Sequence, residues 1–330
     1  MISRRSLIVG AGLGVTALAD TARAQAPRAN GKPWGAEYQA KKGDVTLALY
    51  RKRAAAPKAG EKPLPVLVLV HGSSISAKPS FDLTVPGNGE YSMMNVFAAS
   101  GFDVWTLDHE GYGKSSRTDG NSDITSGVED LKAAAAVIAR ESGRPRFHFY
   151  GSSSGALRAA AYAMVEPDRV GRLALGAFTY TGKGSPTLGK RAEQVEFYRT
   201  HNRRPRGRDM ILSIFTRDGH ATATDLAVAE ALADAELKFG DTIPTGTYLD
   251  MTANLPVVDP ARVKAPVLLV RGEHDGIATM DDLLDFYQRL PNGDRQFVVL
   301  PETAHSLGLS LKRHYLWHVV RAFLTLPTDS

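Results

Sequence analysis

The clearest candidate for chemistry is the segment Gly151-Ser152-Ser153-Ser154-Gly155. An apolar run precedes it and an alanine-rich stretch follows it, so we expect it to join a strand to a helix. Only Ser153 has glycine both two residues before and two residues after it, the spacing that a tight strand-to-helix turn needs because side chains would collide there. Such a turn exposes the hydroxyl at a helix N-terminus, where free N–H groups stabilise negative charge. Ser153 is the predicted nucleophile; the alternative is a turn that only caps the helix.

A serine hydroxyl is a weak nucleophile and needs a base, which the sequence offers among nine histidines. His305 follows the apolar run at 295–300 and precedes a helix expected from about residue 307, which places it on a loop at the carboxyl end of a late strand. His314 and His318 lie four residues apart on that last helix and are expected to pack or to face solvent, since no carboxylate accompanies them to bind a metal. His148 lies inside an expected strand and is interpreted as a satisfied core histidine. His305 is therefore the predicted base.

An imidazole base needs a carboxylate that fixes its tautomer and stabilises its charged form. Asp275 is predicted for this role, because it lies on the loop Arg271-Gly272-Glu273-His274-Asp275 that leaves the strand expected at 267–270. Glu273 is the alternative on the same loop. The chain order serine, aspartate, histidine is the order expected for an α/β-hydrolase sheet.

A hydrolytic serine also needs N–H donors that hold the oxyanion of the tetrahedral intermediate. The segment His71-Gly72-Ser73-Ser74 follows an apolar strand, so its backbone can face the nucleophile turn. We assign the two donors to the backbone N–H groups of Ser73 and Ser154. The ring of His71 is expected to brace this loop and not to take part in the reaction.

Short apolar runs separated by helical stretches predict the elements that position these residues. Strands that alternate with helices indicate right-handed crossovers and a mostly parallel central sheet covered by helices on both faces. The expected strands are 65–70, 102–107, 147–150, 173–177, 267–270 and 297–300, with helices at 128–139 and 156–165 among them. Residues 44–50 alternate in polarity and are expected to form an edge strand, preceded by a loose polar arm at 27–42.

The alternation stops between residues 179 and 258, where amphipathic stretches at 191–198 and 227–235 are joined by breaks rich in glycine, proline and asparagine. An insertion of this size predicts a helical cap over the carboxyl edge of the sheet, where ligands bind in such folds. The core would then comprise residues 25–178 and 259–330. Five arginines crowd one part of the cap and are expected to form a solvated face, with an anion clamp as the alternative: Arg199, Arg203, Arg204, Arg206 and Arg208.

Composition excludes several classes of protein. The 330 residues carry 40 Lys and Arg against 35 Asp and Glu, a net charge of +5, and contain no cysteine. So small an excess of positive charge does not indicate a nucleic-acid-binding protein. The lack of cysteine excludes disulfides, thiolate zinc sites, iron–sulfur clusters and a cysteine nucleophile. We expect neither a cofactor nor a metal.

Residues 1–24 have the pattern of a cleavable export signal. Arg4 and Arg5 precede an uncharged stretch of 14 residues, too short for the ~20 of a spanning helix. Cleavage is expected after Ala24 or Ala26, and the mass of the mature N-terminus would tell which. The double arginine is similar to a twin-arginine signal, which implies the twin-arginine export machinery as a partner and a periplasmic or secreted protein without stable membrane insertion. The alternative is an ordinary secretory signal.

Taken together, these motifs resemble the cap-bearing α/β-hydrolase superfamily from about residue 65 to the C-terminus. The segment Asp108-His109-Glu110-Gly111-Tyr112-Gly113-Lys114-Ser115 is similar to that of epoxide hydrolases and haloalkane dehalogenases. Those relatives have aspartate at the nucleophile position, where this chain has Ser153, which favours acyl chemistry. Ser152 is a second departure, since many esterases of the superfamily have histidine there.

The resulting hypothesis is an exported serine hydrolase that cleaves small to medium carboxylic esters or lactones through an acyl-enzyme on Ser153. Two alternatives use the same triad, namely hydrolysis of C–C bonds in diketone-type substrates and cofactor-free perhydrolysis. A third, from a different class, is a non-catalytic ligand-binding module with a hydrolase-like pocket. The presence of nucleophile, base, acid and oxyanion donors together argues against the last alternative.

Overall fold

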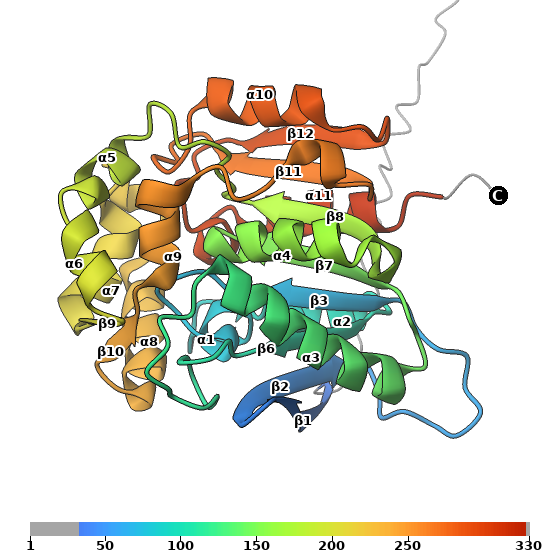
Figure 1. The fold of residues 1–330 in the computed structure, drawn as a ribbon. Coiled ribbons are helices and arrows are strands. Elements are labelled where there is room, and N and C mark those ends of the chain that lie inside the picture. Colours follow the sequence, from blue (N-terminus) through green and yellow to red (C-terminus); the bar gives the residue numbers. More distant parts are fainter. Residues whose placement is uncertain (1–32, 328–330) are drawn as a thin grey trace, which may run out of the picture.

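A central sheet of eight strands organises the computed structural model, which describes residues 33–327 (Figure 1). The strand order is β1-β2-β6-β3-β7-β8-β11-β12, and neighbours are parallel from β6 to β12. The strands are β1 (Trp34–Lys42), β2 (Val45–Arg53), β3 (Val66–Val70), β6 (Asp103–Leu107), β7 (Phe147–Ser152), β8 (Val170–Gly176), β11 (Val267–Gly272) and β12 (Arg295–Leu300). Every side chain of β3 and β6 is buried, as expected for strands covered on both faces.

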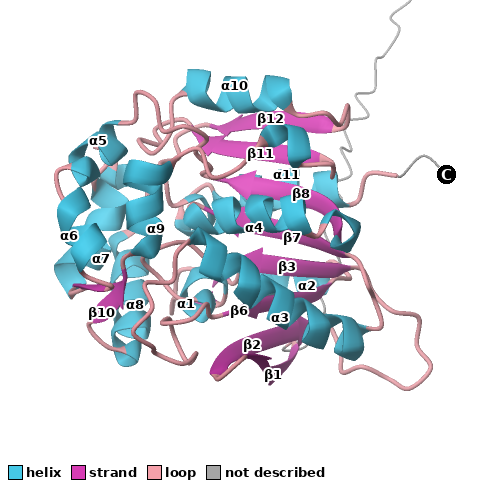
Figure 2. Ribbon diagram, in the orientation of Figure 1, coloured by secondary structure: helices cyan, strands magenta, loops and turns pink. Residues whose placement is uncertain are grey.

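Helices cover both faces of this sheet and complete two apolar cores (Figure 2). One face carries α3 (Ile124–Ser142), α4 (Ser154–Val165) and α10 (Met280–Arg289). The other carries α1 (Ala77–Phe81), α2 (Met93–Ala99) and α11 (Arg313–Leu324). The predicted α/β-hydrolase fold, with a mostly parallel sheet between two layers of helices, is therefore confirmed.

The N-terminal edge of the sheet differs from the prediction. Residues 34–42, expected in a loose arm, form β1 and pair antiparallel with β2 along their whole length. β2 in turn pairs antiparallel with β6, so it lies inside the sheet and is not an edge strand. β1 was not predicted from the sequence because its outer face is polar. In the structure, Ala40 faces the core and Tyr38 packs on the ring of Trp105.

Five short helices lie between β8 and β11 and form a cap-like region. They are α5 (Pro186–Ala192), α6 (Val195–Thr200), α7 (Arg208–Thr216), α8 (Leu226–Glu236) and α9 (Gly246–Leu249), with a two-stranded ribbon of β9 (Arg203–Pro205) and β10 (Thr242–Pro244). Figure 1 shows them at the end of the sheet toward which the arrowheads of the parallel strands point. A second ribbon, β4 (Leu83–Thr84) with β5 (Glu90–Tyr91), packs its Leu83 and Tyr91 against the cap core. The boundaries at residues 179 and 258 stay a prediction.

The predicted export signal, residues 1–24, falls outside the described residues. No helix within residues 33–327 combines the length and the apolar character needed to cross a membrane.

Candidate active site

The turn between β7 and α4 holds Ser153 in a strained backbone conformation. Its φ is 57° and its ψ is −126°, a region that a residue with a side chain rarely adopts. The flanking glycines are required for space: a Cβ on Gly151 would lie 2.5 Å from Cα of Ala156, and one on Gly155 would lie 2.1 Å from the carbonyl oxygen of Val70. The spacing argument made from the sequence thus has a direct steric basis.

Three parallel strands bring Ser153, His305 and Asp275 into one hydrogen-bonded row. Oγ of Ser153 lies 3.0 Å from Nε2 of His305, and Nδ1 of His305 lies 2.9 Å from Oδ1 of Asp275. Each residue follows the carboxyl end of its strand, β7, β12 or β11, so the parallel sheet presents all three at the same edge. Such a row lets the imidazole take the serine proton while the carboxylate stabilises the imidazolium.

The Asp275 carboxylate is kept ionised by its surroundings. Burial alone would raise its pKa, but the charge and hydrogen bond of His305, the backbone N–H of Ile277 and the charge of Arg217 together hold the pKa below its ordinary value. Oδ1 accepts the hydrogen bond from Ile277 at 2.9 Å as well as the one from His305. A fixed negative charge therefore faces the imidazole.

The loop after β3 approaches the nucleophile turn closely enough to share an oxyanion site with it. A Cβ on Gly72 would lie 3.2 Å from Cβ of Ser153, and the hydroxyl of Ser73 donates to the hydroxyl of Ser154 at 2.7 Å. Among the described residues, no hydrogen bond engages the backbone N–H of Ser73 or of Ser154. These two N–H groups thus remain free for an oxygen atom beside Ser153.

Comparison with known proteins agrees with this geometry. The family described as serine aminopeptidase S33 (Hydrolase_4) matches residues 88–309, two thirds of the chain, including Ser153, Asp275 and His305. The chain belongs to this family. It is a serine hydrolase of the α/β-hydrolase superfamily.

Individual relatives of this hydrolase are named for different activities. A 2-hydroxy-6-oxononadienedioate/2-hydroxy-6-oxononatrienedioate hydrolase from Burkholderia vietnamiensis is 27% identical over 248 residues, which cover 69% of this chain and 77% of that protein. The structure of a carboxylesterase from Bacillus subtilis superposes with a TM-score of 0.62 at 19% identity, covering 89% of this chain and 93% of the other. An enol-lactonase from Burkholderia xenovorans superposes with a TM-score of 0.60 at 19% identity, covering 87% and 100%.

The mostly buried segment 108–115 supports the loop after β3, residues 71–76, of this S33 hydrolase and is not among the residues that line the cavity of Ser153. The Asp108 carboxylate accepts hydrogen bonds from the backbone N–H of Ala77 and Lys114 and from the hydroxyl of Tyr50. The backbone N–H of His109 donates to Nε2 of His71 at 3.1 Å, which leaves Nδ1 of His71 to donate to the carbonyl of Gly72 at 2.8 Å. His71 thus braces the loop, as expected.

The other candidate residues from the sequence do not join the row of Ser153, His305 and Asp275. His314 and His318 are exposed on α11. Glu273, the alternative acid, accepts a hydrogen bond from the backbone N–H of Glu302. Among the described residues, it makes no hydrogen bond to His305. His148 corrects the prediction of a satisfied histidine: its Nδ1 has no hydrogen-bond partner among the described residues, and burial lowers its pKa to about 4.

The cap contributes contacts to the active site that the sequence did not reveal. Oδ2 of Asp218, just after α7, accepts from the backbone N–H of His305 at 3.2 Å. Glu236, at the end of α8, accepts from both the N–H and the hydroxyl of Ser76, and its other oxygen pairs with Arg206. Asp218 therefore positions the loop that carries His305, and Glu236 ties the loop after β3 to the cap. Both contacts span long sequence separations, so no local signal marks them.

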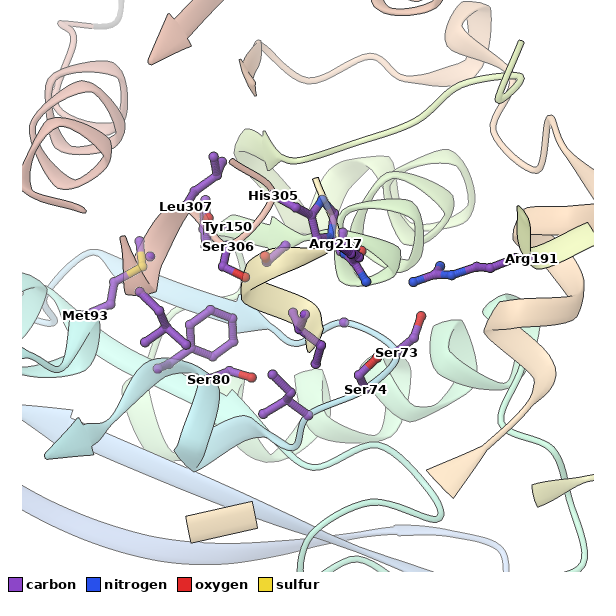
Figure 3. Close-up of a pocket in the computed structure, with 18 residues that line it drawn as sticks. Ser73, Ser74, Ser80, Met93, Tyr150, Arg191, Arg217, His305, Ser306 and Leu307 are labelled. Atoms are coloured by element: carbon purple, nitrogen blue, oxygen red, sulfur yellow. Dashed lines mark hydrogen bonds between the residues drawn. The ribbon is translucent and has the colours of Figure 1, made fainter. Parts of the chain in front are cut away.

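Ser153 lines a cavity together with Ser73, Ser74 and His305 (Figure 3). Apolar residues line one side of it, among them Phe81, Met93, Leu307 and Leu309. The cap contributes Arg191, Ile214 and Arg217 to the opposite side. The site can therefore accept a partly apolar molecule.

Proposed function

We propose that this protein hydrolyses small to medium carboxylic esters or lactones through an acyl-enzyme on Ser153. The observation that carries the proposal is the hydrogen-bonded row from Ser153 through His305 to Asp275, at 3.0 and 2.9 Å, beside two free backbone N–H groups. The shared fold with an esterase and an enol-lactonase supports acyl chemistry at such a site.

Each residue of the row has a defined part in the proposed reaction. Nε2 of His305 takes the proton of Ser153 as Oγ attacks the substrate carbonyl, and the N–H groups of Ser73 and Ser154 hold the resulting oxyanion. Collapse of the intermediate expels the alcohol, which receives the proton from His305. Water then attacks the acyl-enzyme with His305 again as base, and the acid leaves with Ser153 restored.

Hydrolysis of a C–C bond is a second candidate, favoured by the sequence relatives. Their names give 2-hydroxy-6-oxo acids as substrates, and this chain matches them over more than two thirds of its length. The two reactions differ in product: an ester yields an acid and an alcohol, whereas a 2-hydroxy-6-oxo-dienoate yields an acid and a 2-hydroxydienoate.

Covalent labelling tests the nucleophile directly. We expect a fluorophosphonate to form a single adduct on Ser153, found by peptide mass spectrometry, and His305→Ala to abolish it because the hydroxyl then lacks its base. Ser153→Ala should lower ester turnover by several orders of magnitude, whereas Ser152→Ala is the matched control on the same turn. An adduct on another residue, or near-normal turnover by Ser153→Ala, would refute the assignment. Product analysis with an ester panel and a 2-hydroxy-6-oxo-dienoate would then separate the two candidate reactions.

A further inference from the structure

Two arginines of the cap reach the cavity of Ser153 without a partner for their terminal nitrogens. Arg191 on α5 and Arg217 just after α7 both line the cavity that contains Ser73, Ser153 and His305. Figure 3 shows Arg191 extending from the cap toward the space beside Arg217 and His305. Within residues 33–327, the side chain of Arg191 makes no hydrogen bond and no ion pair. The guanidinium of Arg217 has only the Asp218 carboxylate near it, with Nε and Oδ1 3.9 Å apart.

The five arginines that the sequence singled out are occupied elsewhere or lie outside this cavity. Arg206 forms a buried pair with Glu236, and Arg208 pairs on the surface with Glu230 and Asp234. The other three are Arg199, which pairs with Glu196, Arg203, which donates to carbonyls of Gly111 and Thr242, and Arg204, which lies over the rings of Tyr198 and Tyr248.

The packing of Arg191 favours a functional role over a structural one. Its guanidinium carbon lies 5.0 Å from the ring centre of Tyr248, and that of Arg204 lies 4.9 Å from the same ring centre. The hydroxyl of Tyr248 bonds the hydroxyl of Ser74, in the loop after β3, at 2.6 Å. The ring therefore holds the guanidinium in place while its donors stay free. Burial and the charge of Arg217 lower the pKa of Arg191 to about 10, so it remains charged at neutral pH.

The carboxylates around the two guanidinia each accept hydrogen bonds from other groups. Asp275 accepts from His305 and Ile277, Asp218 accepts from the N–H of His305, and Glu273 accepts from the N–H of Glu302. Arg191 has no counter-ion among the described residues, and Arg217 has only the Asp218 carboxylate, 3.9 Å from its Nε. Two like charges at one cavity raise the free energy of the empty protein, and a bound anion relieves this cost. Planar guanidinium forks match the two oxygens of a carboxylate.

We propose that Arg191 and Arg217 bind a carboxylate of the substrate, so that this hydrolase prefers esters that carry a free carboxylate in addition to the scissile ester bond. This assignment rests on the proposed acyl transfer at Ser153, whose cavity the two arginines share. Arg191 is the specificity-determining residue, while Arg217 also acts on the charge of Asp275.

Matched pairs of esters test the proposal. Mono-p-nitrophenyl glutarate and p-nitrophenyl 5-methylhexanoate have the same chain length and differ in whether a carboxylate or two methyl groups end the acyl chain. 4-Carboxyphenyl butyrate and 4-isopropylphenyl butyrate place the same difference on the alcohol side. We expect kcat/KM to favour the anionic ester in at least one pair, and Arg191→Gln to lower that anionic-to-neutral ratio by about ten- to a hundredfold, the effect of losing a charged hydrogen bond.

Two further variants make the result specific. Arg191→Lys keeps the charge and should retain part of the preference, whereas Arg199→Gln, on the exposed side of the cap, should leave the ratio unchanged. If Arg191→Gln leaves the ratio unchanged in both pairs, or if Arg199→Gln lowers it equally, the carboxylate site is refuted.

Direct binding separates this proposal from the proposed reaction. Calorimetry with the Ser153→Ala protein should detect glutarate, and binding should weaken about tenfold or more with Arg191→Gln added. Glutarate binding without turnover of any ester would support the anion site and overturn acyl transfer. Turnover of the neutral esters with no glutarate binding and no preference would support acyl transfer and overturn the anion site.

Discussion

The Asp275 carboxylate keeps its charge although it is buried among protein atoms. Burial disfavours the ionised form, and the opposing effects of His305, the Ile277 N–H and Arg217 outweigh it. The pKa of Asp275 is lower in the folded protein than in the unfolded chain, where it is about 4. Its ionisation therefore stabilises the fold at pH values above about 4, and this contribution is lost as the pH falls through the folded pKa. The charge that orients the base is therefore present throughout the neutral range.

Replacing Asp275 by asparagine tests the role of that charge. The amide has the same size but cannot stabilise an imidazolium and favours the wrong tautomer of His305, so we expect kcat for ester hydrolysis to fall by about 10³ to 10⁴. Glu273→Gln, on the same loop, is the control and should stay within about threefold of the parent. A loss for Asp275→Asn that is no larger than for Glu273→Gln would show that another group orients the imidazole. Steady-state kinetics with p-nitrophenyl 5-methylhexanoate measures both.

At the scale of elements, a buried ion pair within the cap fixes the carboxylate that joins the cap to the loop after β3. Arg206 precedes α7 and Glu236 ends α8, both side chains are at most 2% exposed, and Glu236 also holds Ser76 of the loop after β3. Removing one partner of a buried pair leaves an uncompensated charge, whereas an exposed pair contributes little. The same stretch of chain contains both kinds of arginine, which permits a matched comparison.

We expect Arg206→Gln to lower the free energy of unfolding by about 3 to 5 kcal/mol, because Glu236 would lose its counter-charge inside the protein. Arg208→Gln removes an exposed arginine two residues later and should cost less than about 1 kcal/mol. Urea unfolding followed by fluorescence, to which the buried Trp105 contributes, gives both values. Equal losses in the two variants would contradict the structural distinction between them.

At the scale of the whole molecule, buried histidines couple the stability of the fold to pH. Burial lowers the pKa of His109 and of His148 to about 4, and that of His71 well below its ordinary value. Between about pH 4 and 6.5 the unfolded chain therefore binds protons that the folded protein does not. The free energy of unfolding falls as pH drops through this window.

His148 offers the simplest test, since it lies in β7 away from the reacting atoms. Because its pKa is lower in the folded protein, His148 should lower the free energy of unfolding of the parent by about 1 to 2 kcal/mol at pH 5 relative to pH 7. From pH 7 to pH 5 the free energy of unfolding should fall for both proteins, and we expect the fall to be about 1 to 2 kcal/mol smaller for His148→Gln than for the parent. Urea unfolding at the two pH values measures it. Identical pH dependence in the two proteins would mean that His148 has the same pKa in the folded and the unfolded chain.

Much of this molecule could be predicted from local patterns. The run of buried residues in β3 and the alternation of strands with helices indicate the parallel sheet, because apolar periodicity reflects which faces are covered. Gly151 and Gly155 mark the turn at Ser153, because a side chain at either position would collide with backbone a few residues along the chain or at the end of the neighbouring strand β3. The order of Ser153, Asp275 and His305 after successive parallel strands places them at one edge.

Other features depended on contacts that no local pattern encodes. β1 was missed because its polar face resembles a loop, and it becomes a strand only by pairing with β2. The pairing of Arg206 with Glu236, 30 residues away, and the freedom of Arg191 follow from how the cap helices pack. An arginine's environment is set by residues brought close in space. The sequence by itself therefore determined the sheet and the residues at its carboxyl edge, and only the tertiary structure decided which charges of the cap face Ser153.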